Sequence, residues 1–214
     1  FFVNGAPKKR KKNKKSLNPT KRQLEKLEQF KKHLLIWNKT HNLISKSQTR
    51  NLDEHTQDSL SVVPFVEKNL IDLGSGAGFP GIPIAIVSKN KKIFLVESRT
   101  KKAAFLLHVT NRLQLKNTKV INARAETLLP ENFPQPYEIL ARALGTTKKI
   151  IIAASPLMSA PLTKLRIMKI GPLVDPGALP NELKITETKT IKTKWKDKQH
   201  ILVTIEKRRD ECTQ

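Results

Sequence analysis

The sequence predicts an α/β fold in which helices precede a doubly wound, mostly parallel sheet that ends in an antiparallel hairpin. Three observations support this prediction. An apolar segment at 69–73 leads into a glycine-rich turn and then a helical segment. Apolar and amphipathic segments alternate from 92 to 169, as expected of strands joined by helices. Two β-rich segments, 183–193 and 199–207, follow each other closely and predict the hairpin.

Composition divides the chain into four parts. Residues 1–17 form a basic arm, and its block of like charge between residues 8 and 15 is expected to be disordered. Residues 18–66 are predicted to form a helical extension, residues 67–207 the ligand-binding domain and residues 208–214 a tail. A chain of 214 residues can hold one α/β domain with a sizeable core in addition to this extension.

The helical extension begins with a predicted amphipathic helix. Asn18 and Pro19 are typical of a helix start, and apolar side chains recur at every third or fourth position over 19–38. Such a stripe indicates a helix that packs on the main domain and exposes its basic face. A linker is expected at 39–50.

A second helix is predicted over 52–66. His55 and Asp58 are three positions apart on it and can meet on one face. A histidine in this setting is about as often a structural hydrogen-bonding residue as a member of a ligand site, and both interpretations stay open.

The segment 69–87 is typical of a strand, a glycine-rich turn and a helix. Glycines permit positive φ and let backbone N–H groups approach a ligand, and the helix offers unpaired N–H groups at its positive end. In open α/β folds such a turn holds a nucleotide-like ligand. Gly74, Gly76 and Gly78 fit the pattern GxGxG. The last two also form GxGxxG with Gly81, so the spacing alone leaves NAD and S-adenosylmethionine (SAM) open.

Two carboxylates favour SAM. Glu97 ends the predicted second strand, 92–97, where it can accept hydrogen bonds from ribose hydroxyls in either ligand. Asp72 precedes the first glycine by two residues, and a carboxylate there suits a cationic amino-acid tail and a sulfonium but repels a pyrophosphate. Each acid alone is more simply explained as a turn cap or a solvated strand end. Their joint placement around the glycines favours a ligand site.

Strands and helices continue to alternate after Glu97. Arg124, Ala125 and Glu126 follow the predicted third strand, at the edge where an adenine would lie. Arg142 follows the next strand and is a candidate for contact with substrate or phosphate, with a surface salt bridge as the alternative. The elements predicted in this part are helices over 101–113 and 148–157 and strands over 119–122, 138–141 and 165–169.

The charge of the chain indicates a polyanionic partner. Lys and Arg number 41 against 18 acidic residues, which gives a formal charge of +23. An enzyme of small molecules does not need this excess, and nucleic acid is the common partner of such proteins. Aromatic residues make up only 5% of the chain, so contact with backbone phosphates is a better expectation than extensive base stacking.

Other compositional features exclude several classes of protein. No run of about 18 apolar residues is present, so no membrane span is expected. Cys212 is the only cysteine, which excludes intramolecular disulfides and cysteine-rich zinc sites, and no metal is expected. The lysine excess and a first residue other than Met favour a mitochondrial matrix setting, with the bacterial cytoplasm as the alternative.

Several strings resemble one known family, the small-subunit rRNA 7-methylguanosine methyltransferases, also called glucose-inhibited division protein B. The resemblance covers about residues 24–207. It rests on WNKTHNLI at 37–44, HTQDSL at 55–60, DLGSGAGFPGIP at 72–83, ES at 97–98 with KK at 101–102, ARA at 141–143 and MK at 168–169.

The resemblance implies a class I SAM-dependent methyltransferase fold and methyl transfer to N7 of a guanine in small-subunit rRNA during ribosome biogenesis. Its implied partners are that rRNA and ribosomal or assembly proteins. Together with the local patterns, it places these residues beside SAM: Asp72, Gly74, Gly76, Gly78, Phe79, Glu97, Ser98, Arg124, Ala125 and Glu126. It places these near the target base as candidate catalytic residues: His55, Asp58, Arg142 and Lys169.

The chain also departs from the family pattern. Glu54 stands where the family usually has an arginine, Gln199 stands where a basic residue is usual before the last strand, and Ile170 is inserted between Lys169 and Gly171. These departures motivate an alternative function, a catalytically impaired assembly factor that binds the small-subunit precursor.

Overall fold

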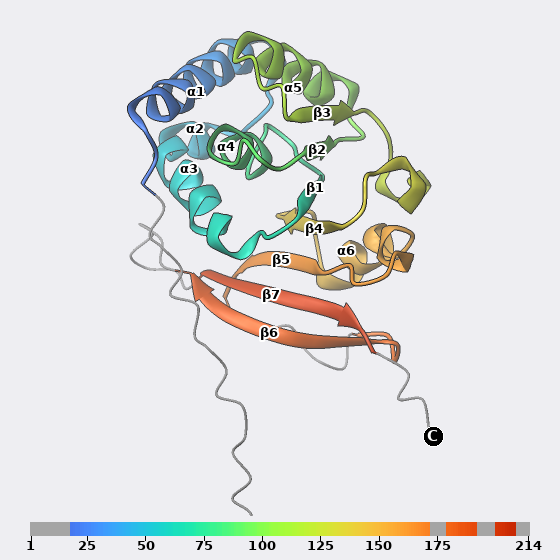
Figure 1. Cartoon of the computed structure of the whole chain (residues 1–214). Coiled ribbons are helices and arrows are strands. Elements are labelled where there is room, and N and C mark those ends of the chain that lie inside the picture. The colour runs from blue at the N-terminus through green and yellow to red at the C-terminus, as the bar shows by residue number, and fades with distance from the viewer. Residues whose placement is uncertain (1–17, 172–178, 192–199, 209–214) are drawn as a thin grey trace, which may run out of the picture.

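The structure is a computed structural model that describes residues 18–171, 179–191 and 200–208 (Figure 1). The predicted basic arm, the segment between the two strands of the C-terminal hairpin, Gln199 and all of the predicted tail but its first residue lie outside the described residues. None of the helices in the described ranges is both long and apolar enough to cross a membrane.

The described strands form one mixed sheet. The strands are β1 (Asn69–Leu73), β2 (Ile93–Val96), β3 (Thr118–Ile121), β4 (Tyr137–Arg142), β5 (Leu165–Ile170), β6 (Leu183–Ile191) and β7 (His200–Lys207). Their order is β3-β2-β1-β4-β5-β7-β6. The first five pair in parallel, whereas β7 runs antiparallel between β5 and β6. The doubly wound sheet with a closing antiparallel hairpin is thus confirmed.

Helices cover both faces of this sheet. They are α1 (Lys21–His41), α2 (Lys46–Arg50), α3 (Leu52–Ser61), α4 (Gly81–Val87), α5 (Thr100–Arg112) and α6 (Thr147–Ala154), with short 3₁₀ turns η1 (Val63–Phe65), η2 (Ala125–Thr127), η3 (Pro130–Asn132) and η4 (Leu157–Ser159). Helices α1, α3, α4 and α5 share one core cluster, and α6 belongs to a second cluster on the other face (Figure 1). Because both faces are covered, the central strands are buried except at the first residue of β1 and the last residue of β4, and most of their residues are apolar.

The start of α1 differs from the prediction. Thr20, rather than Asn18, is the N-cap, and it forms a capping box with Gln23. Both capping-box bonds form with Thr20 because Gln23 lies three residues after it, at the position from which a side chain can reach back to the cap. The helix then buries Leu27, Phe30 and Leu34 against the domain, as the apolar stripe predicted.

The predicted linker and second helix also need correction. The linker contains α2, which Ser45 caps through a second capping box with Gln48. The second helix ends at Ser61, and a short 3₁₀ turn that contains Pro64 replaces its predicted last turn. Proline cannot continue the helical hydrogen-bond ladder, which explains the early end.

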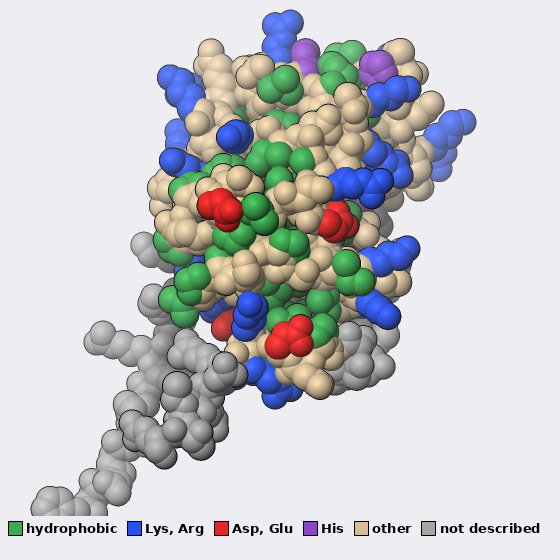
Figure 2. Space-filling model, turned by 90° about the vertical axis from the view of Figure 1, so that its right-hand side faces the viewer, with side chains coloured by type: hydrophobic (Ala, Val, Ile, Leu, Met, Phe, Trp, Pro, Cys, Tyr) green, Lys and Arg blue, Asp and Glu red, His purple; other side chains and the backbone are tan. Residues whose placement is uncertain are grey.

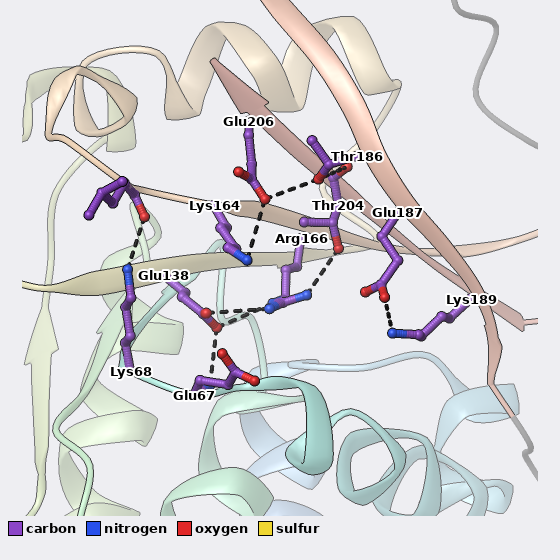
Figure 3. A network of polar contacts seen from close by, with 11 residues as sticks. Glu67, Lys68, Glu138, Lys164, Arg166, Thr186, Glu187, Lys189, Thr204 and Glu206 are labelled. Carbon is purple, nitrogen blue, oxygen red and sulfur yellow. Dashed lines mark hydrogen bonds and ion pairs between the residues drawn. The ribbon is translucent and has the colours of Figure 1, made fainter. Parts of the chain in front are cut away.

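A buried polar network joins β4, β5 and β7 near the ends of these strands that lie away from the glycine-rich turn (Figure 3). Arg166 Nε and Nη2 donate to the two carboxylate oxygens of Glu138 at 3.2 and 3.3 Å, and Nη1 donates to Thr204 Oγ1 at 3.0 Å. Arg166 pairs with Thr204 in the β5–β7 ladder, and in the same register Ile170 pairs with His200. The network therefore helps to fix the register that brings the far ends of β5 and β7 to the ligand edge of the sheet.

Candidate active site

A cavity of about 740 Å³ opens at the carboxyl ends of β1, β2, β4 and β5. This is the edge at which open α/β sheets bind ligands. The wall combines the glycine-rich turn, the ends of β2 and β4, the start of α5 and the facing ends of β5 and β7. Its lining includes Ile44, Gln48, His55, Gly74, Gly76, Phe79, Glu97, Ser98, Arg99, Lys102, Arg142, Leu144, Gly145, Met168, Lys169, His200 and Ile201.

Two of the three glycines of GxGxG line the cavity. Gly74 has φ +66°, and a Cβ there would lie 2.2 Å from Leu144 Cδ1. Gly78 has φ +97° but is not part of the cavity wall, since a Cβ there would meet Ile82 and the ring of Phe30 on α1. Gly74 and Gly76 therefore shape the cavity wall, whereas Gly78 allows α1 to pack on the turn.

Glu97 is the carboxylate that holds the turn. One of its oxygens accepts the Gly76 N–H at 2.8 Å and the other accepts the Arg99 N–H at 2.8 Å. Asn122, at the end of β3, donates to the Glu97 backbone carbonyl at 2.8 Å. Each carboxylate oxygen keeps a second lone pair, and the residue lines the cavity, so Glu97 is placed to receive ribose hydroxyls.

Asp72 lies beneath the turn and is not part of the cavity wall. Its side chain is completely buried, and Oδ2 accepts the N–H of Gly81, the first residue of α4, at 3.1 Å. A Cβ at Gly81 would lie 2.4 Å from Asp72 Oδ2, so only glycine permits this approach. The direct contact with a cationic tail that the sequence suggested stays a prediction, because the structure shows Asp72 bound to the protein backbone.

Burial raises the pKa of Asp72 to about 7, although hydrogen bonds from Ser75 and Gly81 and the charge of Arg142 oppose the rise. The folded state therefore holds a proton that the unfolded chain releases near pH 4, so the contribution of Asp72 to stability falls as pH rises from about 4 to 7.

Asp72→Asn should remove this part of the pH dependence, since an amide keeps the shape of the protonated acid. Relative to the unaltered chain, we expect the variant to gain about 2–3 kcal/mol of unfolding free energy between pH 5 and pH 8. Urea unfolding of both proteins at the two pH values measures the difference. A constant difference would show that Asp72 is ionised throughout.

His55, Asp58, Arg142 and His200 form one polar cluster behind the cavity. Arg142 donates to His55 Nδ1, and its Nη2 lies 3.7 Å from Asp58 Oδ2. His200 Nδ1 lies 3.2 Å from the same carboxylate oxygen. The predicted meeting of His55 and Asp58 on one face is thus mediated by Arg142. Asp58 is 1% exposed and is absent from the wall of the cavity, so it holds its neighbours rather than facing a ligand.

Burial lowers the pKa of two members of this cluster, His55 and Arg142. Burial, followed by the charges of Arg142 and His200, lowers the pKa of His55 to about 4, so its imidazole is neutral at pH 7. Arginine can only donate, so His55 Nδ1 accepts and the proton sits on Nε2. Burial also lowers the pKa of Arg142, but Asp58 and Asp72 oppose that shift and the guanidinium stays cationic.

The remaining predicted residues divide into two groups. Phe79, Ser98 and Lys169 line the cavity. The Phe79 ring packs against that of His55 in a tilted arrangement with centroids 5.7 Å apart, and Lys169 donates to Thr147 at 3.1 Å. Residues 124–126 are not part of the wall: they lie at η2, with Arg124 and Glu126 exposed. Their contact with an adenine stays a prediction.

Several cavity residues were not predicted as site residues. Arg99 and Lys102 could have been predicted from the sequence, because they closely follow Glu97 at the carboxyl end of a predicted strand. His200 had no such signal in its local sequence. It reaches the site only because β7 turns back beside β5, which is a property of the tertiary fold.

Comparison with known proteins identifies the family. The model of GidB, described as rRNA small subunit methyltransferase G, matches residues 23–170. The chain is 34% identical over 190 residues to the ribosomal RNA small subunit methyltransferase G of Ectopseudomonas mendocina, covering 86% of this chain and 87% of the relative. It is 35% identical over 177 residues to that of Xanthomonas oryzae, with 81% and 82% covered.

Solved structures support the fold. A SAM-dependent methyltransferase from Aquifex aeolicus aligns with TM-score 0.52 and 16% identity over 78% of this chain and 97% of that chain. Magnesium protoporphyrin IX methyltransferase from Synechocystis with bound SAM aligns with TM-score 0.58 and 12% identity, covering 89% of this chain and all of the other. At such low identity these likenesses concern the fold alone.

Proposed function

The chain belongs to the GidB family of rRNA small subunit methyltransferases G, and from this premise we propose that it transfers a methyl group from SAM to N7 of a guanine in small-subunit rRNA. The observation that carries the proposal is the cavity at the sheet edge, which has the Glu97 carboxylate on one side and Arg142 and Lys169 on the other.

The residues present suit SAM. Glu97 offers lone pairs for the ribose, Gly76 leaves the wall beside it open, Gly74 makes room for Leu144, and Phe79 and Leu144 provide apolar contacts. Bound SAM supplies an electrophilic methyl group on a sulfonium. The protein's task is then to orient the guanine and to exclude water.

The target chemistry explains why no catalytic base is evident. Guanine N7 carries a lone pair and no proton, so its attack does not require a general base, and positioning supplies much of the acceleration. His55 is neutral and already accepts from Arg142, so we assign it to holding the guanidinium. An arginine bound to N7 would block attack, and we therefore assign Arg142 to O6 of the base or to a phosphate. Lys169 lies on the same wall and is assigned to phosphate.

The proposal is tested by incubating the protein with SAM labelled in the methyl group and with small ribosomal subunits that lack the modification. We expect labelled 7-methylguanosine in digested rRNA. Gly76→Asp is the matched inactive control: at φ +57° Asp is tolerated better than most residues, and the nearest atom outside the turn is Lys102 Nζ at 3.9 Å, so the fold should persist. Its carboxylate would enter the cavity beside Glu97, and we expect activity to fall at least about 100-fold, the equivalent of about 3 kcal/mol.

The same experiment distinguishes the alternative. If the unaltered chain and Gly76→Asp both associate stably with the subunit precursor, and neither forms 7-methylguanosine, the chain acts as an assembly factor and not as an enzyme. The relatives named above are bacterial, which supports the bacterial cytoplasm over the mitochondrial matrix; the matrix and protein partners on the ribosome stay predictions.

A further inference from the structure

Two helices that begin beside the cavity carry lysines where a helix favours acids. The first turn of α5 contains Lys101 and Lys102, that of α6 contains Lys148 and Lys149, and neither has an acidic residue. The N-terminus of a helix is the positive end of its dipole, so a cation in this turn is unfavourable. These positions therefore reduce the stability of both helices.

Ion pairing does not compensate for these charges. Within the ranges 18–171, 179–191 and 200–208, no carboxylate lies within 4.0 Å of the amines of Lys101, Lys148 or Lys149. All three residues are exposed. In contrast, Lys31 and Lys164 pair with acids elsewhere on the surface. The three lysines are therefore cations that folding does not require.

Their positions bracket the cavity. Helix α5 follows β2 and α6 follows β4, so both begin at the carboxyl edge of the sheet. Lys102, the residue after Lys101, lines the cavity. Gly145 also lines it, and a Cβ atom added to this glycine would lie 3.5 Å from the side chain of Lys149. Helices α5 and α6 pack on opposite faces of the sheet (Figure 1). The lysines in their first turns are therefore expected on both sides of the opening. The excess of basic side chains is not confined to the cavity: on the side of the molecule shown in Figure 2, Lys and Arg side chains lie around the margin and acidic groups are few and scattered.

We propose that Lys101, Lys148 and Lys149, here called the lysine rim, bind the phosphates of the rRNA strand on both sides of the target nucleotide. The inference rests on the proposed function and names the surface that holds its substrate. Phosphate contacts of this kind set position and supply affinity but do not read sequence. Selection of the base is then left to the cavity between them.

The test is a triple charge reversal, Lys101→Glu with Lys148→Glu and Lys149→Glu. The control makes the same change in charge at the opposite edge of the sheet: Lys89→Glu with Lys92→Glu and Lys116→Glu, three exposed residues in the loops before β2 and β3. For each protein the affinity for a single-stranded fragment of small-subunit rRNA is measured over a range of salt concentrations, together with SAM affinity and thermal stability.

The rim variant should lose about 30-fold or more in RNA affinity near 0.1 M salt, and its log–log salt slope should become shallower by about 2, as for three lost contacts of about 0.7 each. Its SAM affinity should be unchanged. Its melting temperature should stay equal or rise, because glutamates suit the starts of α5 and α6. The control variant should lose less than about 5-fold in RNA affinity.

Equal losses in both variants would overturn the rim, because they would show only general attraction between charges. Unchanged RNA binding by the rim variant would overturn it as well. The proposed function fails separately. If the unaltered chain binds RNA through the lysine rim but forms no 7-methylguanosine, the proposed enzymatic function is refuted and the RNA-binding role of the rim stands. If the rim variant still binds RNA and methylates it, only the role of the rim is refuted.

Discussion

Glu138→Ala is expected to lower the free energy of unfolding by about 3–5 kcal/mol. Glu138 is fully buried, and both of its oxygens accept from Arg166 (Figure 3). Removing the carboxylate leaves a guanidinium that is about 5% exposed and whose remaining hydrogen-bond partner among the described residues is Thr204, at 3.0 Å. A buried charge without its counterion cannot regain water, which is why the loss exceeds that of an ordinary hydrogen bond.

Two further variants separate this cause from simple loss of contacts. Glu138→Leu combined with Arg166→Met replaces the ion pair with apolar groups of similar size, and it should cost much less than Glu138→Ala. Lys164→Ala removes one partner of a half-exposed pair, Lys164 with Glu206 at 3.4 Å, and should cost at most about 1 kcal/mol. Urea unfolding measures all three. If the double variant were as unstable as Glu138→Ala, the uncompensated charge would not be the cause.

The network also bears on how the site is assembled. Thr204 and His200 lie on the same strand, and β5 pairs with β7 from Leu165 to Ile170. The ion pair stabilises one end of this ladder, and the cavity lies at the other. A stable distal end therefore supports the register that brings His200 to Asp58, without contacting any ligand.

The parallel core could be predicted from sequence because its signals are local. Continuous apolar runs mark buried parallel strands, and the glycine-rich turn after 69–73 marks the ligand edge. Glu97 lies in the cavity wall at this edge, where the end of the predicted strand 92–97 places it, and its contact with a ribose stays a prediction. Periodicity likewise predicted the buried stripe of α1.

The rest depended on contacts between distant segments. Whether Asp72 faces a ligand or the start of α4 depends on the path of the turn, which its neighbours in sequence do not fix. Part of the space beside Gly78 is filled by the ring of Phe30, a residue 48 positions earlier. The pairing of Asp58 with His200 joins the second predicted helix to the last strand. No local pattern contains such information.

Glu97→Ala is expected to weaken SAM binding by about 100-fold or more, and to abolish methylation at ordinary SAM concentrations. The carboxylate is charged and accepts two backbone N–H groups, and the same oxygens are placed for ribose hydroxyls. Hydrogen bonds to a charged group contribute about 1.5–3 kcal/mol each, so loss of two toward the ligand gives about 3 kcal/mol or more. Calorimetric titration with SAM measures the change.

Two controls make the result specific to the site. Glu131→Ala removes an exposed acid on η3 and should change SAM affinity less than about 3-fold, because a solvated carboxylate at this distance is screened. Glu97→Gln keeps the shape but places an NH₂ against the N–H of either Gly76 or Arg99, so it should restore only part of the affinity. RNA binding should be retained in all three variants, since the lysine rim is untouched. If Glu97→Ala bound SAM normally while remaining folded, the cavity would not be the SAM site, and the assignment of the ribose to β2 would fail.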